Sequence, residues 1–75
     1  MDLMEIPGTR KTYVTEKNEI YYALVECEDV DEKGNLRYYV VRDVNPDGSD
    51  RETSWVIDEW VTLEDGVSRI AIESA

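Results

Sequence analysis

The chain has 75 residues, 18 of them acidic and 8 basic, so its formal net charge is −10, and it contains no histidine. A chain of this length forms one domain that buries only about 60 % of the surface it exposes when unfolded, which leaves no room for both a core and a deep catalytic cleft. The negative charge repels nucleic acid and anionic membranes, so direct binding to either is excluded. A hydrophobic fraction of 41 % and strongly alternating stretches exclude disorder.

The single cysteine, Cys27, cannot form an internal disulfide, and no apolar run is long enough for a signal peptide or a membrane span. These features predict a reducing, cytoplasmic compartment. Cys27 is expected to be a small buried side chain rather than a nucleophile, because the chain has no histidine to activate it.

Residues 1–11 show no sustained hydrophobic period, and Pro7-Gly8 marks a turn. We therefore expect an N-terminal arm over residues 1–11 and a single β domain over residues 12–75. The arm has three apolar side chains that can pack onto the body of that domain, namely Leu3, Met4 and Ile6.

The first hairpin is expected to join a short strand at 12–15 to a long strand at 19–28. Residues 16–18 have the composition of a three-residue loop, with Asn18 in the left-handed conformation. Counting outward from this loop places Tyr13 beside Tyr21.

A polar connection over residues 29–35 leads into the next strand, with Gly34-Asn35 as its turn signal. The expected register places Val25 opposite Tyr38. The length of this loop leaves room for a β-bulge, which would shift that register.

The strongest local signal is a hairpin over residues 36–57 with a turn at 45–48. Pro46 suits the first central position of a type I turn, and Gly48 suits a left-handed position that completes a three-residue loop. The expected register pairs Asn45 with Ser49, Asp43 with Arg51, Arg42 with Glu52 and Tyr39 with Trp55. A slip by one residue would place like charges opposite each other, which is destabilising.

Beyond this hairpin, Asp58-Glu59 interrupts the apolar alternation and predicts a bend in the chain. Residues 64–66 have the acid-glycine composition of a further loop. We therefore expect two more strands, at 60–63 and 67–73, and no helix.

These elements predict an all-β fold: one small antiparallel meander of five to six strands, curled into an SH3-like barrel or a half-open sandwich. Both alternating sets of side chains in residues 20–27 are apolar, which predicts a sheet covered on both faces. The cover is either the N-terminal arm together with the C-terminal strands, or a partner chain.

Residues 43–48 match the first half of a calcium-binding loop, D-x-N-x-D-G. The twelfth position of such a loop should be a bidentate glutamate, but here it is Ser54. We interpret the stretch as a hairpin turn and expect no metal and no cofactor. No serine, cysteine or carboxylate pair is placed to converge on a catalytic pocket, so we expect a protein that is not an enzyme.

The acidic residues are the remaining signal. On one face of a strand, side chains at i and i+2 lie roughly 6.7 Å apart, which is of the order of the spacing of successive phosphates. The sequence predicts two acidic patches and two aromatic anchors for a partner: Glu26, Glu28, Asp29, Asp31 and Glu32; Asp47, Asp50 and Glu52; and Tyr39 with Trp55.

The function expected from this pattern is electrostatic docking on a basic protein that handles nucleic acid, in its sharpest form as a nucleic-acid-mimicking inhibitor of the kind that phages encode. The alternative is a structural or adaptor domain that homodimerises or adds a strand to a partner. Its acids would then serve solubility, as in a halophilic protein.

Overall fold

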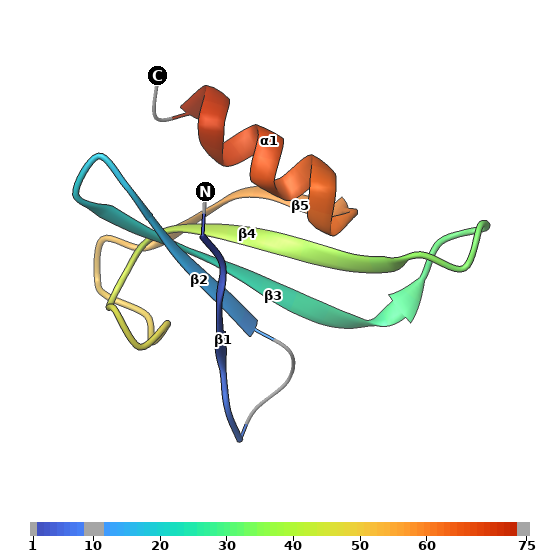
Figure 1. The fold of residues 1–75 in the computed structure, drawn as a ribbon, viewed down its shortest axis with the longest axis horizontal. Coiled ribbons are helices and arrows are strands. Elements are labelled where there is room, and N and C mark those ends of the chain that lie inside the picture. Colours follow the sequence, from blue (N-terminus) through green and yellow to red (C-terminus); the bar gives the residue numbers. More distant parts are fainter. Residues whose placement is uncertain (1, 9–11, 74–75) are drawn as a thin grey trace.

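A computed structural model describes residues 2–8 and 12–73, and in this part of the chain a five-stranded antiparallel sheet carries one helix (Figure 1). The elements are β1 (Met4–Ile6), β2 (Thr12–Lys17), β3 (Ile20–Val30), β4 (Leu36–Val44), β5 (Trp55–Val61) and α1 (Leu63–Glu73). The order of strands in the sheet is the order in the chain, so the predicted meander of a small, mostly β domain is confirmed. The predicted barrel is wrong, because the sheet stays open with β1 and β5 at its two edges.

The stretch expected to be an arm contributes a strand, since Met4–Ile6 pairs with β2. Two of the three apolar side chains named for packing are in contact with the body: Leu3 with one core cluster and Ile6 with another. Met4 remains exposed. The residues from 9 to 11, also assigned to the arm, lie outside the described part of the chain.

The first hairpin has a shorter turn than expected. Asn18 has the predicted left-handed conformation, but Glu19 shares it, with φ of 53° and 68° respectively, so the loop has two residues and Lys17 pairs with Ile20. A two-residue turn of this kind matches the twist of the flanking strands. The predicted pairing of Tyr13 with Tyr21 is therefore wrong, and Tyr13 lies opposite Leu24.

Between β3 and β4 the register differs from the expected one by a single residue, with Val25 opposite Tyr39 instead of Tyr38. The cause is an irregularity between Glu26 and Val30, in the region where the loop length left room for a bulge. The shift matters because Tyr39 becomes the direct neighbour of Val25 on one face of the sheet.

In the central hairpin the predicted turn is confirmed, but the strand after it starts late. The amide of Asn45 donates to the carbonyl of Ser49 over 2.9 Å, and Gly48 is left-handed with φ of 86°. A second turn then follows, in which the amide of Ser54 donates to the carbonyl of Arg51 over 3.0 Å.

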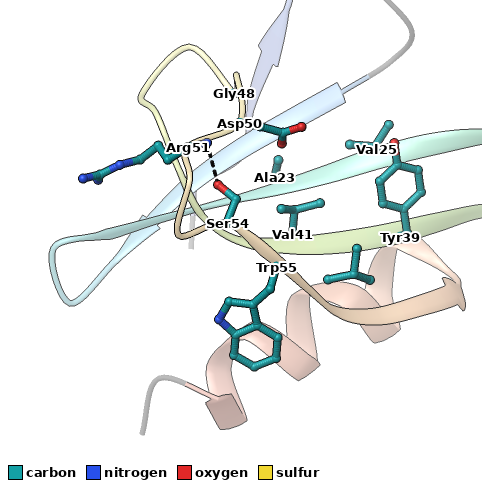
Figure 2. Close-up of a pocket in the computed structure, with 10 residues that line it drawn as sticks. Ala23, Val25, Tyr39, Val41, Gly48, Asp50, Arg51, Ser54 and Trp55 are labelled. Atoms are coloured by element: carbon teal, nitrogen blue, oxygen red, sulfur yellow. Dashed lines mark hydrogen bonds between the residues drawn. The ribbon is translucent and has the colours of Figure 1, made fainter.

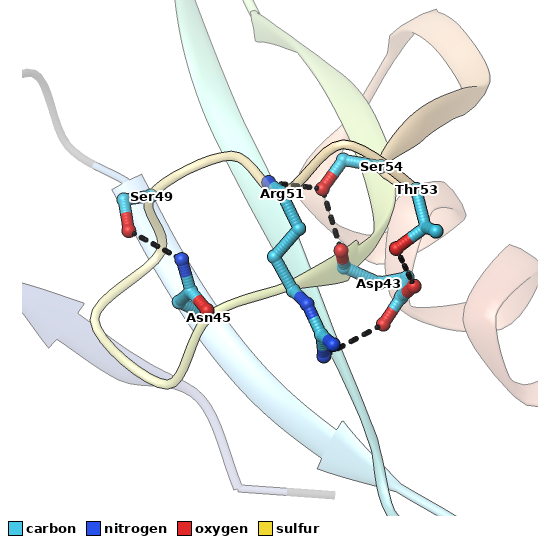
Figure 3. A network of polar contacts seen from close by, with 6 residues as sticks. All are labelled: Asp43, Asn45, Ser49, Arg51, Thr53 and Ser54. Atoms are coloured by element: carbon cyan, nitrogen blue, oxygen red, sulfur yellow. Dashed lines mark hydrogen bonds and ion pairs between the residues drawn. The ribbon is translucent and has the colours of Figure 1, made fainter.

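Side chains fix this second turn to the end of β4 (Figure 3). The hydroxyl of Ser54 donates to the carbonyl of Asp43 over 2.5 Å and accepts from the amide of Arg51 over 2.8 Å. The carboxylate of Asp43 accepts from Thr53 and pairs with the Arg51 guanidinium, at 3.3 Å for the latter. Because residues 51–54 form a turn, β5 begins at Trp55 opposite Arg42. The predicted pairings of Arg42 with Glu52 and of Tyr39 with Trp55 are wrong.

The C-terminal segment from Leu63 is a helix and not the strand expected at 67–73, and of the strand expected at 60–63 only residues 60–61 are in a strand, at the end of β5. Thr62 precedes it as a cap, with its hydroxyl accepting from the amide of Asp65 over 3.1 Å. The helix packs on the sheet through apolar side chains at helical spacing, Leu63, Val67 and Ile70. Gly66 allows the close approach, because a Cβ at this position would lie 2.6 Å from Cδ2 of Leu24.

The predicted bend at Asp58-Glu59 corresponds to irregular pairing of β5. Val40 pairs with Asp58 and Tyr38 with Val61, so two residue steps on β4 face three on β5. Trp60 lies in this bulge with φ of 63°, a conformation that is strained for a residue with a side chain.

The sheet buries apolar side chains on both faces, as predicted. On the face under α1, Ile70 packs among Tyr22, Leu24, Tyr38 and Val40. The opposite face carries a second cluster of buried side chains, Val14, Ala23, Val41 and Val44, and the loop over residues 45–54 lies against one end of it through Gly48. We call this second face, opposite α1, the open face. No helix in residues 2–8 and 12–73 is both long and apolar enough to cross a membrane.

Candidate partner-binding surface

Three shallow hollows meet on the open face, and the side chain of Tyr39 lines all of them. Two lie toward the 45–54 loop, where Tyr39 shares the wall with Val25 and Asp50. The third lies toward the far end of β3, beside Cys27 and Trp60. Tyr39 is thus the centre of the hollowed surface.

At the loop end, a carboxylate extends over an apolar floor (Figure 2). Ala23, Val25 and Val41 form the floor, and Asp50 lies above them. Among the residues that the structure describes, no hydrogen bond or ion pair engages the Asp50 carboxylate. Asp50 is exposed, so its carboxylate is accessible to a cation, which would form a charge-assisted hydrogen bond with it.

The other end of the open face combines aromatic and acidic side chains. Cys27, Glu28, Asp29, Tyr39 and Trp60 line this hollow. The Arg37 guanidinium pairs with the Asp29 carboxylate, and its central carbon lies 5.4 Å from the centroid of the Trp60 ring. This part of the surface therefore already accommodates one guanidinium by an ion pair and a cation–π contact.

The bulge in β5 explains why Trp60 reaches the open face. It changes the alternation of side chains after Asp58, and Trp60 comes to lie with Tyr39 and Cys27 while 56 % of it stays exposed. The sequence reasoning missed Trp60 as a candidate anchor. The related signal in the sequence is Asp58-Glu59, which interrupts the apolar alternation at the place where the bulge changes the alternation of side chains.

Two of the predicted acids are fixed by the turns in which they lie. Asp31 accepts from the amides of Lys33 and Asn35, both over 2.9 Å. The hydrogen bond from the Asn35 amide is the main cause that lowers the pKa of the Asp31 carboxyl. Asp47 accepts from the hydroxyl and the amide of Ser49, which lower the pKa of its carboxyl in the same way.

These shifts predict that the free energy of unfolding falls in acid. A carboxyl whose pKa is lower in the folded state stabilises the fold fully above its unfolded pKa of about 3.9, and this contribution is lost as the pH falls through the folded value. The difference in unfolding free energy between the wild type and Asp47→Asn, measured by urea titration, should therefore shrink from pH 7 to below pH 3. A difference that stays constant would show that the Ser49 hydrogen bonds do not favour the charged carboxylate.

The open face brings together half of the residues predicted to bind a partner: Glu28, Asp29, Tyr39, Asp47 and Asp50. The other half lie elsewhere. Trp55 contributes to the rim of one hollow, but its indole extends from β5 on the α1 side (Figure 2). Glu52 is exposed in the second turn of the 45–54 loop.

Glu26 lies on the face under α1, opposite Tyr38, and is half-buried. Its Oε2 atom is buried without a hydrogen-bond partner among the described residues. The pKa of the Tyr38 hydroxyl is raised, mainly by burial and to a smaller extent by the neighbouring Tyr13 and Glu26. Glu26 is thus separated from the acids with which the sequence grouped it.

Asp31 and Glu32 lie at the tip of the β3–β4 hairpin. Acids from the start of α1, which the sequence did not group with them, lie close to this tip. A hollow there is lined by Asp31 and Glu32 together with Thr62 and Asp65 from the start of α1. Glu64 lines a neighbouring hollow with Gly34. The first predicted patch is therefore extended by the first turn of a helix where the sequence predicted a loop.

The loop that matched a calcium motif uses its oxygens internally. Asp43 binds Arg51 and Thr53, and Asp47 binds Ser49. Within residues 2–8 and 12–73, no group of three or more potential ligand side chains could hold a metal ion.

No protein-family model, curated protein or solved structure matches this chain.

Proposed function

We propose that this protein is a non-enzymatic binding module that docks on a basic surface of another protein. The observation that carries the proposal is the hollowed open face, where an apolar centre at Tyr39 has Asp47 and Asp50 at one end and Glu28 and Asp29 at the other. A net charge of −10 supports fast, electrostatically steered association with a cationic partner. Proteins with a basic surface are the class of partner that complements this charge.

The sharper form of the proposal is mimicry of nucleic acid, with inhibition of a protein that handles nucleic acid as its outcome. The two acidic ends support it, because the β3–β4 hairpin and the 45–54 loop lie at opposite ends of the longest axis (Figure 1). The molecule measures 34 Å along that axis. One turn of duplex DNA is about 34–36 Å long, so the molecule is about as long as one turn of the duplex that it would mimic.

The absence of catalysis is part of the same proposal. A general acid at neutral pH needs a raised carboxyl pKa, whereas the shifts of Asp31 and Asp47 are downward. Their carboxylates are suited to stay charged, which serves electrostatic docking.

The test is a binding measurement with purified basic DNA-binding domains, by fluorescence anisotropy, in about 10 mM and about 150 mM salt, over which the Debye length falls from about 30 Å to about 8 Å. We expect affinity to fall steeply with salt and duplex DNA to displace the protein. Asp50→Lys should weaken binding about tenfold, or about 1.4 kcal/mol.

Glu5→Lys is the matched control, because it changes the net charge equally. Glu5 is exposed on β1 opposite Tyr13, on the α1 side of the sheet. Equal losses from both variants would mean that only total charge matters. An affinity that does not change with salt concentration would contradict electrostatic docking altogether.

A second candidate function, strand addition or homodimerisation, is favoured by the β5 edge. Three large apolar side chains are exposed there, Trp55, Val56 and Trp60. An exposed apolar edge strand is a template for pairing. The bulges of β5 and the negative charge of a second copy oppose this route. Sedimentation that shows a concentration-dependent dimer insensitive to salt would favour it over docking.

A further inference from the structure

We propose that the open face holds an extended basic segment of the partner, with one cationic side chain at each end and an apolar side chain over Tyr39. This inference rests on the proposed function and names the chemistry of the segment. It also assigns a role as a binding residue to Trp60.

The floor of the open face sets the length of the segment. Ala23, Val25 and Cys27 alternate along β3, with Val41 and Tyr39 as the neighbours of the first two on β4. From Ala23 to Cys27 there are four residue steps, which span roughly 13 Å at the rise of a strand. An extended segment has the same interval between side chains on one of its faces, so positions i, i+2 and i+4 lie over this floor.

At the Ala23 end, Asp50 selects a cation. Its carboxylate lies above the floor without a partner among the described residues. A lysine or arginine reaching it would lay its aliphatic stem on Val25 and Val41, as long basic side chains do on apolar surfaces.

At the Cys27 end, the exposed part of the Trp60 ring selects a second cation. The position of Arg37, on the Trp60 ring and paired with Asp29, shows that a guanidinium suits this environment. More than half of Trp60 is still exposed, so an arginine of the partner can stack on the remaining ring surface. The strained backbone that presents Trp60 is consistent with a functional position.

The centre between the two ends is apolar. Tyr39 and Val25 are half-buried, and they lie directly opposite each other in the ladder. A valine or leucine at i+2 would bury them further. On the face that contacts the sheet, the segment therefore has a cationic side chain at i, an apolar one at i+2 and a cationic one at i+4.

Two synthetic peptides of equal composition and charge test this pattern. In the spaced peptide, arginines stand four positions apart with valine midway and serine elsewhere; in the clustered peptide, the two arginines are adjacent. By anisotropy in about 10 mM salt, we expect the spaced peptide to bind about fivefold more tightly.

Trp60→Gly should remove most of that preference, with a loss of about fivefold for the spaced peptide. This variant relieves the positive φ, so it should fold at least as well as the wild type. Ile72→Ala is the control, because Ile72 is 68 % exposed on α1, which packs on the face opposite the open face, and it should leave the affinity within about twofold. Asp50→Asn provides a second variant and should also weaken the spaced peptide only.

The outcomes separate this inference from the proposed function. If both peptides bind alike and Trp60→Gly does not differ from the wild type, the segment pattern is overturned while electrostatic docking stands. A dimer in sedimentation that Trp60→Gly dissolves would assign the open face to a second copy and overturn the inference as well. If neither peptide shows salt-dependent binding, the proposed function fails too.

Discussion

Ile70→Ala should lower the free energy of unfolding by about 2–5 kcal/mol, the usual cost of truncating a fully buried isoleucine. Ile70 has no exposed surface and is the α1 residue buried in the core cluster with Tyr22, Leu24, Tyr38 and Val40. A domain of this size has a net stability of only about 3–5 kcal/mol. The variant should therefore be largely unfolded, or only marginally stable, at 25 °C without urea. Urea titration followed by circular dichroism measures the loss.

Ile72→Ala is the matched control, since it removes the same atoms two residues further along the same helix. Ile72 is 68 % exposed, so its truncation should change the unfolding free energy by less than about 0.5 kcal/mol. Similar losses from both variants would mean that the helix does not pack through the Ile70 face. A normal stability of Ile70→Ala would contradict the burial of Ile70 in this core cluster.

This helix marks the main limit of the sequence prediction. Glu64, Asp65 and Gly66 have the composition of a hairpin loop, and Val67 begins a stretch that also fits a strand. The competing signal was a cap at Thr62 with acids in the first turn and apolar residues at helical spacing. Packing against the sheet decides between the two, because Gly66 lets the helix approach Leu24 closely, and no local propensity reports that contact.

The registers show the same division between local and distant causes. The turn at Asn45–Gly48 was predictable, since proline and glycine restrict the backbone directly. The second turn at Arg51–Ser54 depends on hydrogen bonds from Ser54 and Thr53 to Asp43, about ten positions earlier in the chain. A count of residues outward from the first turn cannot include such a contact, so β5 was placed in the wrong register.

The candidate site was predictable to the extent that it depends on composition. The acids of the turns and Tyr39 were identified, because turn acids follow from turn chemistry and an aromatic in a strand from its propensity. The face of the sheet on which each of these side chains lies was not predictable. Trp55 and Trp60 have similar surroundings in the sequence, but the bulge in β5 sends Trp60 to the open face and leaves Trp55 on the α1 side.

Gly48→Ala tests the contact that covers one end of the open face, and it should lower the unfolding free energy by about 2–5 kcal/mol. Gly48 has φ of 86°, where a side chain costs about 1–2 kcal/mol. A Cβ there would also collide with Cδ1 of Ile6 and lie 3.0 Å from Cγ2 of Val14, which is fully buried. Overpacking of this kind typically adds about 1–3 kcal/mol.

Gly34→Ala separates these two contributions. Gly34 has nearly the same conformation, with φ of 82°, but a Cβ at this position would meet nothing within 4 Å. Its substitution should therefore cost only the left-handed conformation, about 1–2 kcal/mol. Urea titration of both variants gives the difference, which measures how tightly the 45–54 loop is held against β1 and β2. If the two substitutions lower the unfolding free energy equally, the loop can shift away from Ile6 and Val14 at no cost. The position of Asp50 over the open face is then not fixed by that contact.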